Sequence, residues 1–252
     1  MIEIFILSLI QGITEFLPIS SSSHLILIAD YLDFENQKLA IDVSLHIGSF
    51  FAVIVFFRKD FYNFFQNRVL FLKIIIGSIP VIIVGFLLVK FNIIEQLRNI
   101  KVIAWTTLIF GVLLYISDKF DLKKEIKKEF TYKSAIFIGF FQILSLIPGV
   151  SRSGITITGA RFLNFRRVDS AKISFLLSIP TLAAVSIFGL KNLIISNNLD
   201  FSFLMLSSIF FSFIFSFITI KYFLKFIKTF SLGVFVIYRV LLGVTLLVIA
   251  YL

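Results

Sequence analysis

The sequence contains no cysteine, which excludes disulfide bonds and thiolate chemistry. Charged residues are also scarce, because they make up 15% of the chain against roughly 25% in an average soluble domain. The segment Ile2–Leu17 has neither a basic stretch nor a small-residue cleavage site, so we expect it to belong to the mature protein. The whole chain is 59% hydrophobic, with a mean hydropathy of +1.03. This balance favours an integral membrane protein.

The hydrophobic residues gather in long blocks such as Ile74–Val89 and Phe201–Ile220, separated by short charged connections. A spanning helix needs about 20 apolar residues, so the chain has room for several spans, and blocks this long fit helices better than barrel strands. The net charge of +10 comes from basic residues that flank these blocks. We therefore expect a lipid bilayer, and no nucleic acid, as the partner of the basic residues.

The chain also resembles itself at a fixed offset. Gln11 matches Gln142 and Phe34 matches Phe165, both 131 positions apart. The segment Leu70–Val89 aligns with Phe201–Ile220 at the same offset. Two homologous halves, about 1–125 and 131–252, therefore form one integral membrane domain. Weak internal symmetry of this kind is typical of membrane folds built from repeats.

Each half opens with an interrupted hydrophobic segment, at about 3–29 and about 134–163. Pro18 and a serine run break the first segment, and Pro148-Gly149 breaks the second, so each piece is too short to span. We expect two re-entrant helical hairpins, each followed by three transmembrane helices. Because three is odd, the second repeat would have inverted topology, and the hairpin tips would meet near the midplane. The predicted fold class is an all-α integral membrane protein.

The basic residues are distributed unevenly between the two predicted sides. Sixteen of the 24 Lys and Arg residues fall in the connections near 58–69, 118–133, 161–172 and 221–231, and five fall in the other connections. This bias places the first group in the cytoplasm and predicts both termini outside.

The first hairpin tip carries a polar set. Gln11 and Glu15 are four residues apart and share one helical face. Ser20–Ser23 can cap the outgoing helix, and His24 follows in its first turn.

The second tip carries Ser151, Arg152, Ser153 and Thr156 at the start of another helix. Helix N-termini and arginine side chains both favour phosphate groups, so the two tips together form a candidate cradle for a diphosphate. An ionised residue at mid-bilayer costs about 2.5–3.5 kcal/mol, which makes Glu15 and Arg152 candidates for function.

Simpler readings stay open for several of these residues. Glu15 and Arg152 could form a purely structural ion pair, and most of the serines could serve only as helix caps. Asp42 and His46, four apart on one predicted span, could face the site or lie in a polar helix start. Arg239 could assist phosphate binding or extend to the membrane interface.

The motifs QGITEFLPISSSSH and PGVSRSGIT resemble the two signature motifs of the undecaprenyl-diphosphate phosphatase family, also called the bacitracin-resistance family. The resemblance covers essentially the whole chain. It implies a bacterial cell (inner) membrane enzyme that hydrolyses undecaprenyl diphosphate to the monophosphate and phosphate. That activity recycles the cell-wall lipid carrier and requires a divalent cation, Mg2+ or Ca2+.

The resemblance also assigns roles to residues. The catalytic positions of the family correspond to Glu15, Ser21, His24 and Arg152. Its phosphate-binding set corresponds to Ser151, Arg152, Ser153 and Thr156. Glu15, with Gln11 in a place that is often glutamate, would help to bind the cation. Many members have Thr-Gly where this chain has Ser22-Ser23, so the first turn could be shaped differently. The motifs leave Ser21, His24 and water open as the nucleophile.

A secondary transporter or a polyprenyl-phosphate flippase is the alternative function, because inverted repeats with paired hairpins are also transporter architecture. Such a protein would need Arg152 and the helix ends, but not Ser21 and His24 beside a metal-binding carboxylate. The oligomeric state is open, and a homodimer is one alternative.

Overall fold

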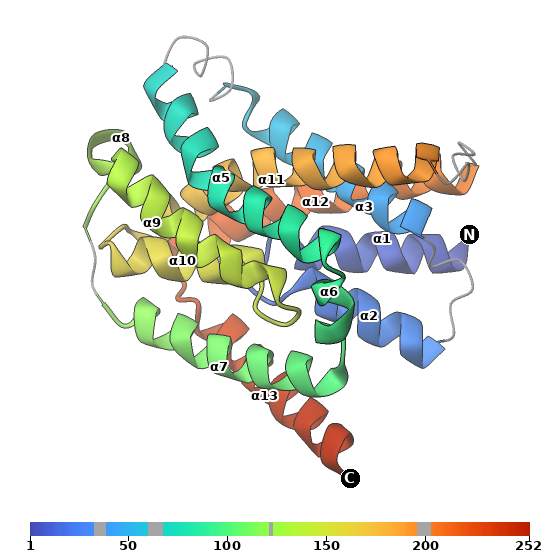
Figure 1. The fold of residues 1–252 in the computed structure, drawn as a ribbon. Helices are drawn as coiled ribbons and strands as arrows, with labels where there is room; N and C mark the ends of the chain where they lie inside the picture. The colour runs from blue at the N-terminus through green and yellow to red at the C-terminus, as the bar shows by residue number, and fades with distance from the viewer. Residues whose placement is uncertain (33–38, 60–67, 121–122, 196–202) are drawn as a thin grey trace.

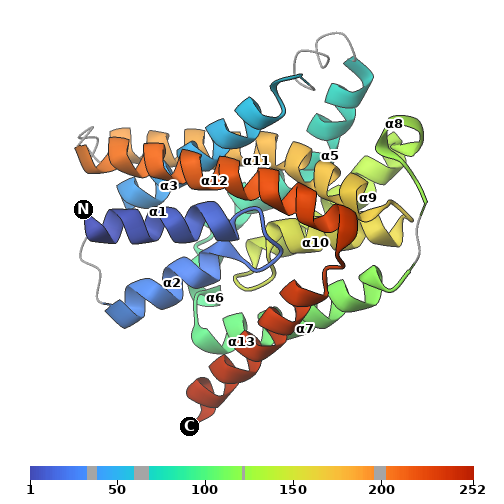
Figure 2. The same ribbon diagram turned by 180° about the vertical axis from the view of Figure 1, so that it is seen from behind.

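The computed structural model describes residues 1–32, 39–59, 68–120, 123–195 and 203–252, and these residues are helical throughout apart from turns and loops (Figures 1 and 2). In this part of the chain, the only extended pairing is an isolated bridge between Lys124 and Phe165. The helices are α1 (Ile2–Thr14), α2 (Ser21–Leu32), α3 (Leu39–Phe56), α5 (Arg68–Lys90), α6 (Ile93–Leu97), α7 (Ile100–Asp118), α8 (Ile126–Glu129), α9 (Tyr132–Ile143), the 3-10 turn η1 (Leu144–Leu146), α10 (Arg152–Phe162), α11 (Arg167–Ile195), α12 (Phe203–Thr229) and α13 (Gly233–Tyr251).

Among the described residues, six helices are long and apolar enough to cross a membrane, namely α3, α5, α7, α11, α12 and α13. The sequence predicts three spans in each half, and this number is confirmed for the described part of the chain. The charged connections predicted near 30–38, 58–69, 118–133 and 191–200 fall partly outside the described residues.

The remaining longer helices form two helix–turn–helix units, where the sequence predicts hairpins at about 3–29 and about 134–163. In the first unit, α1 ends at Thr14 and α2 begins at Ser21, so Pro18 lies in the turn. In the second unit, α9 continues into η1, and α10 begins at Arg152. Figure 1 places α1 and α2 toward the N-terminus on the right and α9 and α10 on the left, so the two turns face each other in the middle.

Small residues let several helices approach closely. A Cβ atom at Gly48 of α3 would lie 2.4 Å from the carbonyl oxygen of Ile209 in α12, so this contact tolerates no side chain. Nearby, the Ser49 hydroxyl lies 3.2 Å from that of Ser212 and 2.9 Å from that of Ser216. The α3–α12 interface is therefore held by backbone proximity and serine hydrogen bonds.

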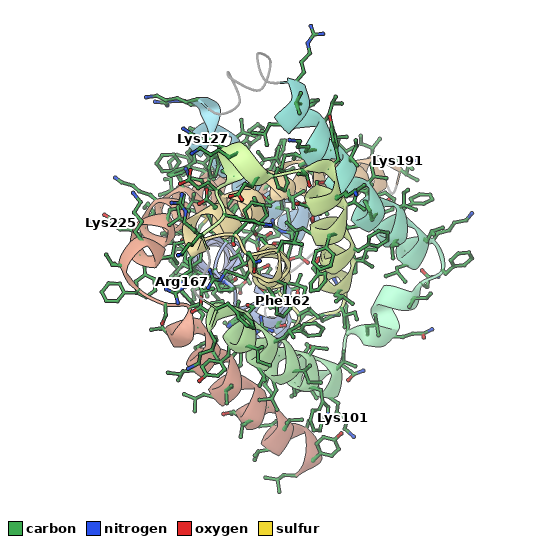
Figure 3. All side chains as sticks on the ribbon, turned by 90° about the vertical axis from the view of Figure 1, so that its left-hand side faces the viewer. Lys101, Lys127, Phe162, Arg167, Lys191 and Lys225 are labelled. Carbon is green, nitrogen blue, oxygen red and sulfur yellow. The ribbon has the colours of Figure 1, made fainter. Side chains whose placement is uncertain are left out.

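The outer surface is apolar. Phe86 on α5, Phe210 on α12 and Leu241 on α13 are each more than half exposed. Figure 3 looks along the bundle, with Phe162 of α10 near the centre and side chains, including Lys127 and Lys225, projecting around the edge. Large exposed apolar surfaces are unfavourable in water, so this exterior, together with the six candidate spans, makes the chain a multi-pass membrane protein.

A charged network joins several connections at one end of the bundle. Asp118, at the end of α7, pairs with Arg161 at 3.6 Å and with Arg167 at 2.6 Å, and it accepts a hydrogen bond from the N–H of Leu232 at 2.9 Å. The 118–133 and 161–172 connections meet here, next to the residue that follows the 221–231 connection, because Asp118 binds Arg161, Arg167 and the N–H of Leu232.

Candidate functional site

The two turns border one cavity of about 530 Å³. Its polar wall includes Glu15, Ser20, Ser21 and Ser22 from the first turn and Ser151 and Arg152 from the second. The cavity therefore brings together the two polar motifs that the sequence separates by more than 120 positions.

Both turns use the same unusual backbone conformation at equivalent repeat positions. Ser20 has φ 74° and Ser151 has φ 71°, in a region that residues other than glycine rarely adopt. Gly149, which precedes Ser151 by two residues, has φ 93°. A positive φ at the N-cap reverses the chain within one residue, and this strained geometry is typical of functional sites.

The second turn is capped by its own serine. The Ser151 hydroxyl accepts a hydrogen bond from the N–H of Gly154 at 3.2 Å and lies 3.2 Å from the hydroxyl of Ser153. The first turn has a matching arrangement, in which the Ser20 hydroxyl lies 3.0 Å from that of Ser23. Both outgoing helices therefore begin beside the cavity, where the free N–H groups of a helix N-terminus favour an anion.

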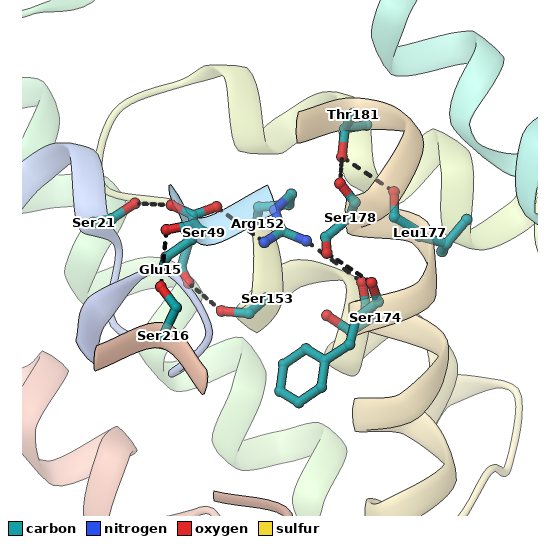
Figure 4. Close-up of polar contacts among 12 residues, drawn as sticks. Glu15, Ser21, Ser49, Arg152, Ser153, Ser174, Leu177, Ser178, Thr181 and Ser216 are labelled. Carbon is teal, nitrogen blue, oxygen red and sulfur yellow. Dashed lines mark hydrogen bonds and ion pairs between the residues drawn. The ribbon is translucent and has the colours of Figure 1, made fainter. Parts of the chain in front are cut away.

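Glu15 and Arg152 link the two turns directly (Figure 4). Nη2 of Arg152 donates to Oε1 of Glu15 at 3.0 Å, and Nη1 of Arg152 donates to the carbonyl of Ser174 at 3.4 Å. The exposed fractions of these side chains are 7% for Glu15 and 13% for Arg152. Each charge offsets the desolvation cost of the other, while the guanidinium keeps further donors free on the cavity wall.

The other carboxylate oxygen of Glu15 has two partners. Oε2 accepts a hydrogen bond from the Ser21 hydroxyl at 2.6 Å and another from the amide of Gln11 at 3.1 Å. A hydroxyl that donates to a carboxylate at this distance is positioned to lose its proton.

Of the residues predicted to bind the diphosphate, the structure brings only Ser151 and Arg152 to the cavity wall. The Ser153 hydroxyl donates instead to the carbonyl of Leu17 at 2.7 Å. The Thr156 hydroxyl oxygen lies 2.7 Å from that of Ser174 and 2.7 Å from the carbonyl oxygen of Arg152. Ser153 thus ties the two turns together, and Thr156 anchors α10 to α11.

His24 is predicted as a catalytic residue, and the structure does not bring it to the cavity. Its Nδ1 lies 2.6 Å from the carbonyl oxygen of Ser20, and its Nε2 hydrogen-bonds to the hydroxyl of Tyr238 in α13. The His24 and Tyr238 rings are stacked with their centroids 5.7 Å apart. In this conformation His24 joins α2 to α13.

Of the other predicted residues, Asp42, His46 and Arg239, only His46 reaches the cavity wall. His46 lies on the cavity wall, with Nδ1 2.8 Å from the carbonyl oxygen of Asp42, whereas the Asp42 side chain is not part of the wall. Arg239 is fully buried and outside the wall, and its guanidinium nitrogens donate to backbone carbonyls.

Several residues of the wall are not among the predicted site residues. They are Thr14, Gln142, Ser145, Thr181 and Lys191, together with Ser20 and Ser22, which the sequence predicts only as helix caps. The 131-residue repeat could have indicated Gln142, because it matches Gln11 of the first motif. Ser145, Thr181 and Lys191 stand in no motif, and only the packing of η1 and α11 against the turns brings them to the cavity.

The rest of the cavity is apolar and comes from two spans, together with Leu146 of η1. The contributing residues are Val81, Ile82, Gly85, Phe86 and Val89 of α5, and Leu182, Ala184, Val185, Ile187 and Phe188 of α11. Phe86 is 56% exposed and Ile187 is 68% exposed, so this wall continues onto the apolar outer surface. The cavity is thus polar at the turns and apolar toward the lipid-facing side.

The residues at the turns fit a divalent cation that shares ligands with a substrate. Among the described residues, no three His, Asp or Glu side chains cluster as a self-sufficient metal site, and Glu15 is the carboxylate of the cavity wall. Oε1 of Gln11, beside Glu15, is buried without a hydrogen-bond partner in the described structure. Mg2+ commonly takes one or two carboxylates together with substrate phosphates, and Glu15 offers one such carboxylate on the cavity wall, with Oε1 of Gln11 beside it.

The arrangement can therefore hold a polyanion between two helix N-termini and Arg152, beside a hydroxyl activated by a carboxylate. It defines a multi-pass helical membrane protein with a cavity that is polar at the two turns and apolar on its other side. A family profile described as bacitracin resistance protein BacA matches residues 4–245. The chain belongs to the bacitracin resistance protein BacA family.

Curated relatives agree with this assignment over their full lengths. A protein of Pelagibacter ubique named undecaprenyl-diphosphatase is 49% identical over 251 residues, covering 99% of this chain and 98% of the relative. Proteins with the same name from Hahella chejuensis and from a Jannaschia species are 43% and 41% identical, each over 98% or more of both chains.

Proposed function

We propose that the chain is an integral membrane phosphatase that hydrolyses undecaprenyl diphosphate to undecaprenyl phosphate and inorganic phosphate. The observation that carries the proposal is that Ser21, Glu15 and Arg152 meet on one cavity wall across the two turns. The full-length relatives named undecaprenyl-diphosphatase identify the substrate class. In a bacterial cell membrane this activity recycles the cell-wall lipid carrier and confers bacitracin resistance.

The substrate would lie across the cavity with its two ends in different surroundings. The diphosphate would occupy the polar wall, where Arg152 and the N-termini of α2 and α10 offset its charge. The first isoprene units would lie between α5 and α11, and the rest of the chain would continue into lipid. This placement follows from the wall itself, which changes from polar to apolar within one cavity.

Ser21 is the nucleophile that the geometry favours. Its hydroxyl would pass its proton to Glu15 while its oxygen attacks the terminal phosphorus. The bond from that phosphorus to the bridging oxygen would break, and undecaprenyl phosphate would leave. Water would then release phosphate from Ser21. Arg152 would stabilise the charge on the transferred group, which is the main requirement of phosphoryl transfer.

The cation belongs to the same proposal. Glu15 and the free Oε1 of Gln11 would hold Mg2+ or Ca2+ together with phosphate oxygens of the substrate. When bound, the cation would supply further neutralisation of phosphate charge.

The proposal also includes the orientation of the chain in the membrane. The two turn units would be re-entrant hairpins of inverted repeats, with the halves 1–125 and 131–252 related by inversion. The support is the shared positive φ of Ser20 and Ser151, and the matched packing of α1 on α12 and of α9 on α5. The basic connections that meet around Asp118 would lie in the cytoplasm, with both termini outside.

The test is phosphate release from undecaprenyl diphosphate by the purified protein in detergent, with and without EDTA. Arg152→Ala and Glu15→Ala are assayed beside the wild type, with correct folding checked by size-exclusion chromatography. Release that requires a cation and that both substitutions abolish supports the proposal. A folded wild-type protein that releases no phosphate with any cation would refute it and direct attention to transport in vesicles.

A further inference from the structure

We propose that Arg239 is a positioning residue that binds backbone carbonyls of both turns from behind and so keeps the N–H of Ser151 facing the diphosphate. The inference rests on the function proposed above, because it explains how the anion site keeps its shape. It also differs from direct phosphate binding, since Arg239 is not on the cavity wall.

The guanidinium of Arg239 joins three parts of the chain. Its Nη1 donates to the carbonyl of Pro18 in the first turn at 3.2 Å and to that of Val150 in the second turn at 3.0 Å. Its Nη2 donates to the carbonyl of Gly149 at 2.9 Å. Its Nε donates to the carbonyl of Thr107 in α7 at 3.2 Å. One side chain of α13 therefore contacts both turns and their supporting helix.

The surroundings are shaped for this side chain. Arg239 is 0% exposed, and a Cβ atom at Gly111 would lie 3.0 Å from its Cβ. A Cβ atom at Gly154 would lie 3.1 Å from its Nη1, so a larger residue at either glycine would press on the arginine. In the described part of the chain, no carboxylate lies within ion-pair distance of Arg239. Among the described residues, the hydrogen-bond partners of its guanidinium are all backbone carbonyl groups.

Peptide geometry links these contacts to the cavity. The peptide bond between Val150 and Ser151 is trans and planar, so its C=O and N–H point in opposite directions. Because the Val150 carbonyl points to Arg239 on the buried side, the Ser151 N–H points away from Arg239. Ser151 lies on the cavity wall, and its N–H has no acceptor among the described residues. Arg239 therefore holds this N–H toward the place of the diphosphate.

The positive charge of Arg239 also favours an anion in the cavity. A buried cation without a carboxylate partner gives the region behind the turns a positive potential, which favours an anion in the cavity. The turn carbonyls would otherwise direct negative partial charge at the same region. Arg239 binds these carbonyls on the side away from the substrate, so the second turn presents the Ser151 N–H to the anion.

The experiment compares Arg239→Gln and Arg239→Lys with Arg161→Gln as a matched control. Arg161 is also a buried arginine that donates to backbone carbonyls, those of Phe165 and Phe120, but it lies in the network around Asp118. Phosphate release is measured well below each variant's melting temperature, and the rate is divided by the folded fraction. Hydrogen exchange is followed in peptides covering 16–20 and 148–154.

Removal of a single preorganised donor lowers kcat by on the order of 100-fold in enzymes, so Arg239→Gln should lower kcat per folded molecule by about that factor. Arg239→Lys should lose about tenfold, because an ammonium group keeps the charge but cannot reach all the carbonyls. Both variants should exchange faster in the two turn peptides. Arg161→Gln should keep kcat per folded molecule and leave exchange in the turn peptides unchanged.

Three results would overturn the inference, namely an unchanged kcat in Arg239→Gln, an equal loss in Arg161→Gln, or turn peptides that exchange at the wild-type rate. The proposed function fails separately, through a wild-type protein that releases no phosphate. In that case the exchange measurement still decides whether Arg239 holds the turns.

Discussion

Arg152→Lys is the substitution that most directly tests the chemistry of the site. The guanidinium contacts Glu15 at 3.0 Å and the Ser174 carbonyl at 3.4 Å with different nitrogens, and it still has donors on the cavity wall. Lysine keeps the positive charge, and so it keeps most of the attraction to Glu15. It replaces a planar fork by a point charge that cannot hold Glu15 and a phosphate in one fixed geometry.

The expected loss of activity in Arg152→Lys follows from the hydrogen-bond donors that the substitution removes. Loss of a single preorganised donor to a developing charge lowers kcat by about 100-fold, which corresponds to about 2.7 kcal/mol of transition-state stabilisation. Stability should change little, because the buried Glu15 keeps a cationic partner. Arg152→Ala should be worse in both respects, since it leaves Glu15 buried without its cation.

Arg166→Lys is the control for the arginine-to-lysine change itself. Arg166 binds Glu125 and Asp169 by ion pairs of 3.0 and 2.9 Å, but it is 48% exposed and is not part of the cavity wall. Its hydrogen bond to Asp169 raises the pKa of the Arg166 guanidinium, so this side chain stays charged at any usable assay pH. Exposed pairs contribute little, so its activity and melting temperature should match the wild type.

The assay is phosphate release from undecaprenyl diphosphate in detergent, fitted for kcat and KM, with melting temperatures measured on the same samples. Arg152→Lys activity within threefold of wild type would show that charge alone is enough and would refute the argument from fork geometry. A large fall in melting temperature for Arg152→Lys would show that the arginine acts mainly as a structural ion pair with Glu15.

Three further predictions concern the nucleophile, the helix packing and the lipid wall. Ser21→Ala should abolish turnover and prevent formation of an acid-stable phosphoprotein in quenched reactions, whereas the control Ser23→Ala, which removes no contact to Glu15, should remain active. Turnover by Ser21→Ala would favour attack by water. Gly48→Ala should lower the unfolding free energy by about 1–3 kcal/mol, because the added Cβ would meet the Ile209 carbonyl. In the control Gly85→Ala the added Cβ only reaches Leu146 at 3.4 Å, so this variant should unfold like the wild type, and equal melting temperatures for the two variants would contradict this packing. Ala184→Phe should fill the wall between α5 and α11 and raise KM for undecaprenyl diphosphate about tenfold, with a smaller rise for a farnesyl substrate; an equal rise for both would place the lipid chain elsewhere.

Local features of the sequence were enough to predict much of this protein. Hydropathy blocks of spanning length predicted three spans in each half, and the breaks at Pro18 and Pro148-Gly149 predicted the two turn units. These predictions succeed because lipid forces the backbone to satisfy its own hydrogen bonds, so apolar length and helix breakers determine the elements. The two motifs also predicted Glu15, Ser21, Ser151 and Arg152, which the structure gathers on one cavity wall.

Side-chain direction was decided only by tertiary packing. Membership of a motif does not state whether a residue faces the cavity or a neighbouring helix, and so Ser153 and Thr156 point into protein while His24 joins Tyr238. The contribution of Lys191 likewise follows from the position of α11.

Arg239 illustrates the same physical reason most fully. Its partners at Pro18, Gly149 and Thr107 are distant in the sequence, and each is a backbone carbonyl that every residue type carries. A contact to a backbone group leaves no residue-type signal at the partner position. The sequence by itself therefore determined which elements form and which motifs carry the chemistry, whereas the packing of α13 against both turns determined what holds them in place.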